Sequence, residues 1–250
     1  MNCLIWNVRG AASNAFRRTF KDMYRHHRPD LVVLLETKCS GSTVTTVIQQ
    51  LGLKYHIVEE TQGFAGGIWV CWNKDDFYIN AIENHNQYIY VKVQEPNVRK
   101  WYFTAVYASP HSQIRRNVWM KLRNIANSME GDWLIAGDFN EIKVTTEKKG
   151  GVATDRSACN LFANWINSCG LIDLGFVGSR YTWRGPKWEG LDRVFKKLDR
   201  ALSNSFWRTR FDEAKVEILA RTNLDHHPLL IKMANDPNSR RDRPFRFEAM

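Results

Sequence analysis

The sequence has no apolar run long enough to cross a bilayer, because a transmembrane helix needs about 20 apolar residues in succession. Its apolar start turns polar after six residues, unlike a secretory signal peptide. The five cysteines are odd in number and form no CxxC pair, which argues against a disulfide framework and a zinc site. Only 15 glycines and 7 prolines are present, too few for a collagen-like or low-complexity chain. We therefore expect a globular cytoplasmic or nuclear protein, without membrane contact, whose cysteines fill its core.

Acidic residues are also few relative to basic ones. The 250 residues include 26 Asp and Glu against 36 Lys and Arg, which gives a formal net charge of +10. Such an excess favours an anionic partner, with nucleic acid first among the candidates. The basic residues concentrate in segments 9–28, 115–123 and 193–210. Each segment taken alone is equally consistent with a solvated helix face, so the charge does not decide the partner by itself.

Strand and helix patterns alternate at the start of the chain. A buried strand at 3–8 precedes a helix that begins after Ser13, and a strand at 30–36 precedes a helix that Ser42 caps and Gly52 ends. Five strand patterns with short turns between them then predict an antiparallel block, at 54–60, 67–72, 78–83, 87–93 and 100–107.

The second half of the chain contains two more helix patterns, at 112–129 and 155–170, on either side of a buried strand at 132–140. Ile114 and Leu161 are among the residues predicted to face the core. Short strand patterns complete the chain, at 180–183, 215–221 and 229–233.

We find no repeat and no linker before a polar tail, so we predict one domain, 1–235, followed by a polar C-terminal extension, 236–250. Strands outnumber helices. This ratio predicts an α/β (α+β) fold in which two sheets pack together with helices outside.

Polar side chains follow the apolar strands at the points where the strands end. These residues are Asn7, Glu36, Tyr107, Asp138, Asn140, Asp225 and His226. Strand ends cluster in layered α/β folds, and their loops commonly carry the site. Carboxylates and carboxamides without thiolates suit Mg²⁺, for which Mn²⁺ can substitute, and that cation suits a phosphate substrate. Each residue alone also has a purely structural interpretation, as a strand end, a helix cap or a surface ion pair.

The order of the motifs resembles that of a known superfamily. The motifs are WNVRG (6–10), ETK (36–38), VYASP (106–110), GDFN (137–140), YTW (181–183), KLDRAL (197–202) and DHHPL (225–229). Over essentially the whole chain they are similar to the endonuclease/exonuclease/phosphatase superfamily, which has the DNase I-like fold. Three further motifs resemble the apurinic-type endonuclease domain of plant non-LTR (LINE-type) retrotransposon polyproteins: GGIWVCW (66–72), EKKGG (147–151) and PFRFE (244–248).

The resemblance implies a four-layer α/β/β/α sandwich and a divalent-metal-dependent DNA endonuclease that nicks one strand. It implies that Glu36 ligates the metal, with Asn7 beside it and Asp225 supporting the metal or the site. Thr182 lies where the family lines the DNA cleft, and Arg9 of the WNVRG motif is expected to contact the DNA. We expect the protein to act as a monomer on DNA.

The resemblance also implies the catalytic residues. Asp138 orients or deprotonates the attacking water, and Asn140 positions that water and the phosphate. His226 stabilises charge on the scissile phosphate, Asp199 holds the tautomer of His226, and Tyr107 contacts the phosphate. Such a set meets the needs of phosphodiester hydrolysis, an activated water and positive charge at the phosphate oxygens. An alternative for Asp199 is an ion pair with a neighbouring basic residue, Lys196, Lys197 or Arg200.

One residue departs from the family pattern. The family usually has Ser immediately before the Asp-His pair, whereas this chain has Leu224, with Thr222 and Asn223 as possible substitutes for the hydroxyl. Leu224 is the basis for one alternative, a decayed domain that binds nucleic acid and cuts poorly. A second alternative keeps the enzyme class and changes the substrate to abasic DNA or a small phosphoester. The chain is expected to be a fragment of a polyprotein that also carries a reverse transcriptase, or a stand-alone remnant.

Overall fold

The computed structural model describes residues 1–250 except 64, 97–99, 188, 191, 223 and 234–250. The predicted C-terminal extension, 236–250, therefore lies outside the described residues, as do Asn223 and the PFRFE motif at 244–248.

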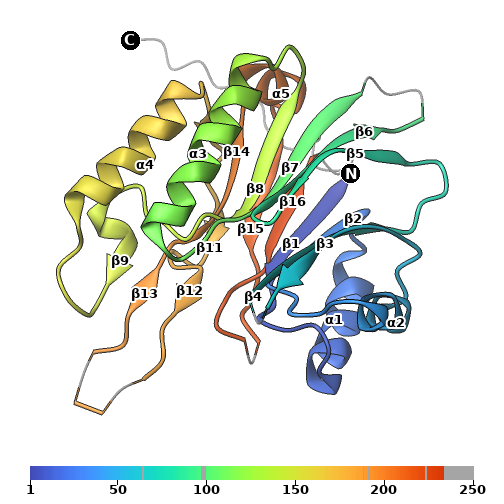
Figure 1. Ribbon diagram of the computed structural model, residues 1–250, viewed down its shortest axis with the longest axis horizontal. Helices are drawn as coiled ribbons and strands as arrows, with labels where there is room; N and C mark the ends of the chain where they lie inside the picture. Colours follow the sequence, from blue (N-terminus) through green and yellow to red (C-terminus); the bar gives the residue numbers. More distant parts are fainter. Residues whose placement is uncertain (64, 97–99, 188, 191, 223, 234–250) are drawn as a thin grey trace, which may run out of the picture.

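A seven-stranded sheet forms one half of the centre of the molecule (Figure 1). Its strands are β1 (Asn2–Asn7), β2 (Leu31–Leu35), β3 (Tyr55–Gln62), β4 (Ala65–Trp72), β11 (Val177–Gly178), β15 (Lys215–Ile218) and β16 (Leu229–Lys232). They lie in the order β11-β15-β16-β1-β2-β4-β3. β1 and β2 are parallel, so their carboxyl ends lie at the same edge.

A six-stranded sheet forms the other half. Its strands are β5 (Tyr78–His85), β6 (Tyr88–Gln94), β7 (Trp101–Tyr107), β8 (Trp133–Asp138), β10 (Ile172–Asp173) and β14 (Asp199–Ser203). They lie in the order β10-β14-β8-β7-β6-β5. β7 and β8 are parallel, and β14 runs antiparallel to β8.

Helices cover the outer faces of both sheets (Figure 1). The helices α1 (Asn14–His27) and α2 (Ser42–Leu51) pack on the seven-stranded sheet, and α3 (Ser112–Asn127) and α4 (Arg156–Ser168) pack on the six-stranded sheet. A short helix, α5 (Ser205–Arg210), follows β14, and a 3-10 turn, η1, spans Thr145–Glu147. None of the described helices is both long and apolar enough to cross a membrane.

A third, small sheet stands apart from the other two at the lower left of Figure 1. It consists of β9 (Lys148–Lys149), β12 (Trp183–Arg184) and β13 (Phe195–Lys196), in the order β12-β13-β9.

Three apolar layers hold these elements together. Alternate residues of each central strand point to opposite faces, so one strand serves two layers. In β1, Cys3 and Ile5 face the layer between the sheets, whereas Leu4 and Trp6 face α1 and α2. The third layer lies between the six-stranded sheet and the helices α3 and α4. The molecule is therefore a four-layer α/β/β/α sandwich, which confirms the predicted DNase I-like architecture.

Several local predictions are confirmed. All five cysteines are free and buried. The side chain of Ser13 accepts a hydrogen bond from the backbone of Phe16 at the start of α1. Gly52 ends α2 with φ of 78°, a left-handed conformation that glycine adopts without steric cost.

Other local predictions are wrong. Ser42 is the first residue of α2 rather than its cap, because Gly41 occupies the cap position and no side chain caps the helix. Ile114 is 48% exposed because the buried face of α3 includes the next residue, Arg115, instead. The guanidinium of Arg115 donates hydrogen bonds to backbone carbonyls. Leu161 is 51% exposed because the adjacent Phe162 fills the core.

The predicted antiparallel block at 54–107 does form, but its strands divide between the two sheets. β3 and β4 join the seven-stranded sheet, whereas β5, β6 and β7 join the six-stranded sheet.

Candidate active site

The alternation of side chains along the strands carries three polar residues into the layer between the sheets. Asn7 continues the series Cys3 and Ile5, and Asp138 continues the series Leu134 and Ala136. Tyr107 ends the equivalent series in β7, and its ring belongs to this layer. Because each residue ends its strand, the apolar layer between the sheets gives way to polar groups at this edge.

The GDFN motif shapes the loop after β8. A Cβ atom at Gly137 would overlap the carbonyl oxygen of Val106 on the adjacent strand, so only glycine allows this close approach. The carboxylate of Asp138 accepts hydrogen bonds from the backbone N–H of Asn140 at 2.9 Å and from the side-chain amide of Asn7 at 2.9 Å. The amide of Asn140 also donates to the carbonyl of Ala108 at 2.8 Å. The structure therefore brings Asp138, Asn140 and Asn7 together, and it fixes their orientation.

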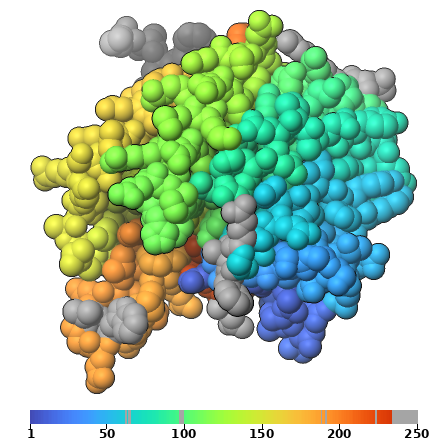
Figure 2. All heavy atoms as spheres, viewed as in Figure 1, coloured from blue at the N-terminus to red at the C-terminus, as the bar shows by residue number. Residues whose placement is uncertain are grey.

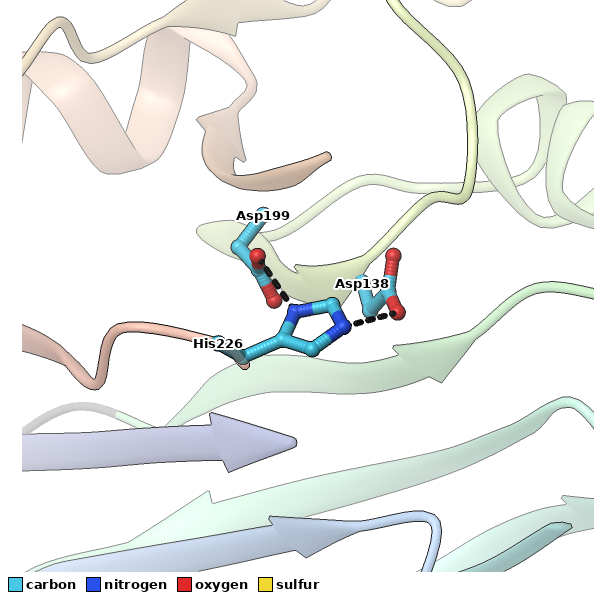
Figure 3. Close-up of side chains that lie close together, drawn as sticks. All are labelled: Asp138, Asp199 and His226. Carbon is cyan, nitrogen blue, oxygen red and sulfur yellow. Dashed lines mark hydrogen bonds and ion pairs between the residues drawn. The ribbon is translucent and has the colours of Figure 1, made fainter. Parts of the chain in front are cut away.

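His226 lies between two carboxylates (Figure 3). Its Nδ1 is 2.9 Å from Oδ2 of Asp199, and its Nε2 is 3.8 Å from Oδ2 of Asp138. Asp199 and Asp138 are direct partners in the register of β14 and β8, which places both on one face of the sheet. All three side chains are almost completely buried.

This environment shifts two pKa values. Burial disfavours the imidazolium, but the carboxylates of Asp199 and Asp138 outweigh burial and raise the pKa of His226 from 6.5 to about 9. Burial and the charge of Asp199 raise the pKa of Asp138 from 3.8 to about 7, against the opposing effect of His226. At neutral pH His226 is therefore a cation that donates from Nδ1 to Asp199 and points Nε2 toward Asp138.

The proposed ion pair of Asp199 with its basic neighbours is wrong. Lys197 and Arg200 lie within ion-pair distance of Asp173 instead, at 3.8 Å and 2.8 Å. Asp199 is 2% exposed, and its carboxylate is hydrogen-bonded to the ring of His226.

Thr182 does not line a cleft, contrary to the prediction, because its side chain is fully buried. Its hydroxyl accepts hydrogen bonds from the backbone N–H groups of Leu198 and Asp199, at 2.9 Å and 3.0 Å. The carbonyl of Thr182 accepts from the backbone N–H of His227 at 2.8 Å. Thr182 thus connects the start of β14 to the segment that carries His226.

A second group of charged residues lies around Glu36. Arg9 donates to Oδ2 of Asp225 at 2.6 Å, and its Nε is 3.6 Å from Oε1 of Glu36. Lys38 is 3.0 Å from the same oxygen of Glu36. The hydroxyl of Tyr107 forms a hydrogen bond with Glu36. Burial and the carboxylates of Glu36 and Asp138 raise the pKa of the Tyr107 hydroxyl above the usual range. Tyr107 therefore stays a neutral hydrogen-bond donor.

Strained backbone concentrates at these residues. Five non-glycine residues in the described chain have positive φ, and four of them belong to this region: Arg9, Glu36, Lys38 and Asn140. Such conformations cost on the order of 1 kcal/mol or more each and cluster at functional sites.

The sequence did not single out Lys38 or Trp183, although both lie in the motifs ETK and YTW. The indole N–H of Trp183 donates to Oδ2 of Asp225 at 3.2 Å. Trp183 also forms a bridge with His226 in the backbone. The available signal was their place in the same motifs, since Lys38 lies two residues after Glu36 and Trp183 directly follows Thr182.

The donor set around Glu36 fits a hard divalent cation. The carboxylates of Glu36 and Asp225 approach one position from two different segments, and the guanidinium of Arg9 shows that this position accepts positive charge. Oxygen donors of this kind suit Mg²⁺ or Mn²⁺. The buried group of Asp138, Asp199 and His226 also has its ligand atoms within 4.8 Å of one another. In that group Nδ1 of His226 is 2.9 Å from Asp199, a hydrogen-bond distance, and we interpret the group as a hydrogen-bonded relay.

Comparisons with known proteins agree with this geometry. The model of the Endonuclease/Exonuclease/phosphatase family matches residues 4–221. The chain belongs to this family. A comparison with curated protein sequences gives no match.

The solved structures of three nucleases share the fold of this family member. The endonuclease domain of TRAS1, a telomere-specific non-LTR retrotransposon, is 13% identical, with a TM-score of 0.69, over 92% of this chain and 96% of that chain. The AP endonuclease LMAP from Leishmania major is 14% identical, with a TM-score of 0.71, over 92% and 86%. The 3'-5' exonuclease NExo from Neisseria meningitidis is 16% identical, with a TM-score of 0.67, over 93% and 99%. The chain therefore has a nuclease/phosphatase fold, whose family members are hydrolases of phosphoesters.

Proposed function

We propose that this protein is a divalent-metal-dependent DNA endonuclease that nicks one strand, of the type found in plant non-LTR retrotransposons. The observation that carries the proposal is the buried set of Asp138, His226 and Asp199, in which an imidazolium is held between two carboxylates. Hydrolysis of a phosphodiester needs a base for water and positive charge beside the phosphate, and this set supplies both.

Asp138 is the group that orients the attacking water and accepts its proton. Its pKa of about 7 is suited to a general base near neutral pH. Asn7 and Asn140 hold its carboxylate in place, and Asn140 presents its side chain beside the same oxygen.

His226 donates from Nε2 to the scissile phosphate, and its positive charge offsets the charge that develops there. Asp199 accepts from Nδ1, which fixes the ring and stabilises the imidazolium. Tyr107 is a neutral phenol with one O–H, which hydrogen-bonds Glu36 and would turn to the phosphate when substrate binds.

Glu36, Asp225 and the carboxamide oxygen of Asn7 are the groups that would hold a divalent cation. When bound, that cation neutralises negative charge on the phosphate oxygens and lowers the pKa of water. The nucleases of this family generally use divalent metals, which supports the same assignment.

The charge distribution supports DNA as the substrate. The small third sheet carries Lys148, Lys149, Arg184 and Lys196, and its strands β12 and β13 belong to the orange part at the lower left of Figure 2. An open groove of about 1060 Å³ lies along it and includes Lys148, Lys196 and Trp183 in its lining, with Glu189 and Asp192 as its acidic members. Together with the net charge of +10, this basic surface next to Asp225 favours a polyanion over a small phosphoester.

The test is cleavage of supercoiled plasmid with Mg²⁺ and with EDTA, using His226→Ala as the inactive control. We expect nicked circles only with Mg²⁺, and only from the wild type. The nicks should carry 3′-hydroxyl ends that a polymerase extends and 5′-phosphate ends that a ligase seals.

Parallel assays with an abasic oligonucleotide and with an inositol phosphate separate the alternative substrates. Faster hydrolysis of either one than of plasmid would reassign the substrate. Binding of DNA without cleavage of any substrate would favour the decayed nucleic-acid-binding remnant.

A further inference from the structure

The guanidinium of Arg9 lies between two carboxylates that come from opposite ends of the sequence. It is 2.6 Å from Oδ2 of Asp225 and, through Nε, 3.6 Å from Oε1 of Glu36. The side chain of Glu36 is only 12% exposed and that of Asp225 only 20%. Both carboxylates are thus largely shielded from water, where charges are weakly screened, and a positive partner stabilises each of them.

The backbone of Arg9 is held rigidly while its side chain is free to leave. Arg9 lies two residues after the end of β1, has φ of 46°, and donates its backbone N–H to Oδ1 of Asn7 at 3.2 Å. Its side chain is 50% exposed, so the guanidinium has access to solvent. A guanidinium in this position is therefore a fixed but replaceable counter-ion.

We propose that Arg9 is the built-in counter-ion of the metal site: a divalent cation must displace its guanidinium from Glu36 and Asp225, so Arg9 sets the metal affinity. This inference rests on the proposed function above. Mg²⁺ binds carboxylate oxygens at about 2.1 Å. A guanidinium hydrogen-bonded to the same carboxylate would then lie within a few ångströms of a charge of the same sign, and the two cations exclude each other.

Lys38 does not take over this role. Its ammonium is 3.0 Å from Glu36, but the ion pairs of Asp225 in the described residues involve Arg9 and not Lys38. Among the described residues, Arg9 is the side chain that forms ion pairs with both carboxylates, so its removal frees Asp225 and leaves Glu36 paired with Lys38 alone.

The decisive experiment measures Mn²⁺ binding by isothermal titration calorimetry, without DNA and at constant ionic strength. The variants are Arg9→Gln and, as a matched control, Arg18→Gln, which removes one exposed positive charge from α1. We expect Mn²⁺ to bind about fivefold more tightly to Arg9→Gln than to wild type, since an ion pair of this kind is worth about 1 kcal/mol. Arg18→Gln should match the wild type.

Thermal melting supplies a second readout. Without metal, Arg9→Gln should melt below the wild type, because Glu36 and Asp225 lose their shared cation. Added Mn²⁺ should then raise its melting temperature more than it raises that of the wild type.

A measurement on the wild type covers the case in which Arg9→Gln fails to fold. The Nε–H signal of Arg9 in a ¹⁵N NMR spectrum should move toward that of a solvated arginine as Mg²⁺ is added, and an equal ionic strength of KCl should leave it in place.

Unchanged or weaker Mn²⁺ binding in a folded Arg9→Gln variant, or an unmoved Arg9 signal with Mg²⁺ bound, would overturn the counter-ion role and leave the proposed function intact. If the wild type and Arg9→Gln both bound no metal, the metal site itself and the proposed metal dependence would fall together.

Discussion

Asp199→Asn is the sharpest test of the proposed relay, because it removes one charge and leaves a hydrogen-bond acceptor of nearly the same shape. In the wild type, the two carboxylates raise the pKa of His226 from 6.5 to about 9 although burial acts in the opposite direction. That difference corresponds to roughly 3 kcal/mol in favour of the imidazolium. Without the charge of Asp199, burial is opposed by Asp138 and Asp225, and we expect the pKa of His226 to fall below its wild-type value.

The pKa is measured directly by NMR titration of the His226 ring, and its effect by the pH dependence of plasmid nicking. We expect turnover at pH 7.5 to fall by about two orders of magnitude, the usual scale for losing acid–base or electrostatic assistance. The loss of activity with rising pH should begin at a lower pH than in the wild type. Substrate binding should change little.

Asp173→Asn is the matched control. Asp173 lies in β10, the strand next to β14, and its carboxylate pairs with Arg200 rather than with His226. An Asp199→Asn variant with near-normal turnover and an unchanged pH profile would show that Asp199 does not act through His226.

Three further predictions concern the same site. Glu36→Ala, Asp138→Ala and His226→Ala should each abolish nicking while DNA affinity at low salt changes little, because Lys and Arg contacts to phosphate dominate binding; filter binding beside the plasmid assay checks both. Urea unfolding should show that the free energy of unfolding of the wild type falls as pH rises from 6.5 to about 9, and that it falls less in His226→Asn. The reason is that folding raises the pKa of His226, so the stabilisation is complete below the unfolded-state pKa and is lost as pH rises through the folded-state pKa. Thr182→Val should cost about 2–4 kcal/mol of stability, since two buried N–H groups lose their acceptor, and Thr182→Ser should restore most of both stability and turnover.

Much of the scaffold around the site follows from the alternation of apolar residues. A reader of the sequence can assign Cys3 and Ile5 to one face of a strand and infer that Asn7 shares it, and the same reasoning applies to Asp138. The pairing of sheets does not follow in this way. Alternation shows that a strand exists, but it does not show which strand lies beside it, so the split of the block at 54–107 could not be predicted.

Contacts between distant segments explain the remaining errors. Thr182 is polar and directly precedes the short strand β12, a position that is as consistent with a surface residue as with a buried acceptor. Its role depends on two backbone N–H groups about sixteen residues later in the chain, and no local pattern encodes that meeting. In the same way, the pairing of Arg9 with Asp225 joins residues separated by 216 positions.

Leu224 provides the last prediction, because the structure shows why the residue is more than an absent serine. Its side chain is partly buried and packs against the apolar layer under α1 and α2, a layer that includes Trp6. Replacing it with Ser should therefore cost about 1–2 kcal/mol of stability, the scale for a partly buried leucine.

The effect of Leu224→Ser on the rate is a separate question from its effect on stability. A hydroxyl that hydrogen-bonds near the phosphate or His226 contributes on the order of 1–3 kcal/mol to the transition state, about tenfold to a hundredfold in rate. We expect Leu224→Ser to nick at least severalfold faster than wild type at temperatures well below its melting point. Leu224→Ala is the matched control, because it loses the same packing without gaining a hydroxyl. If the Ser and Ala variants, both folded, cut at the same rate, then the hydroxyl contributes nothing here, and Leu224 no longer supports the idea of a decayed enzyme.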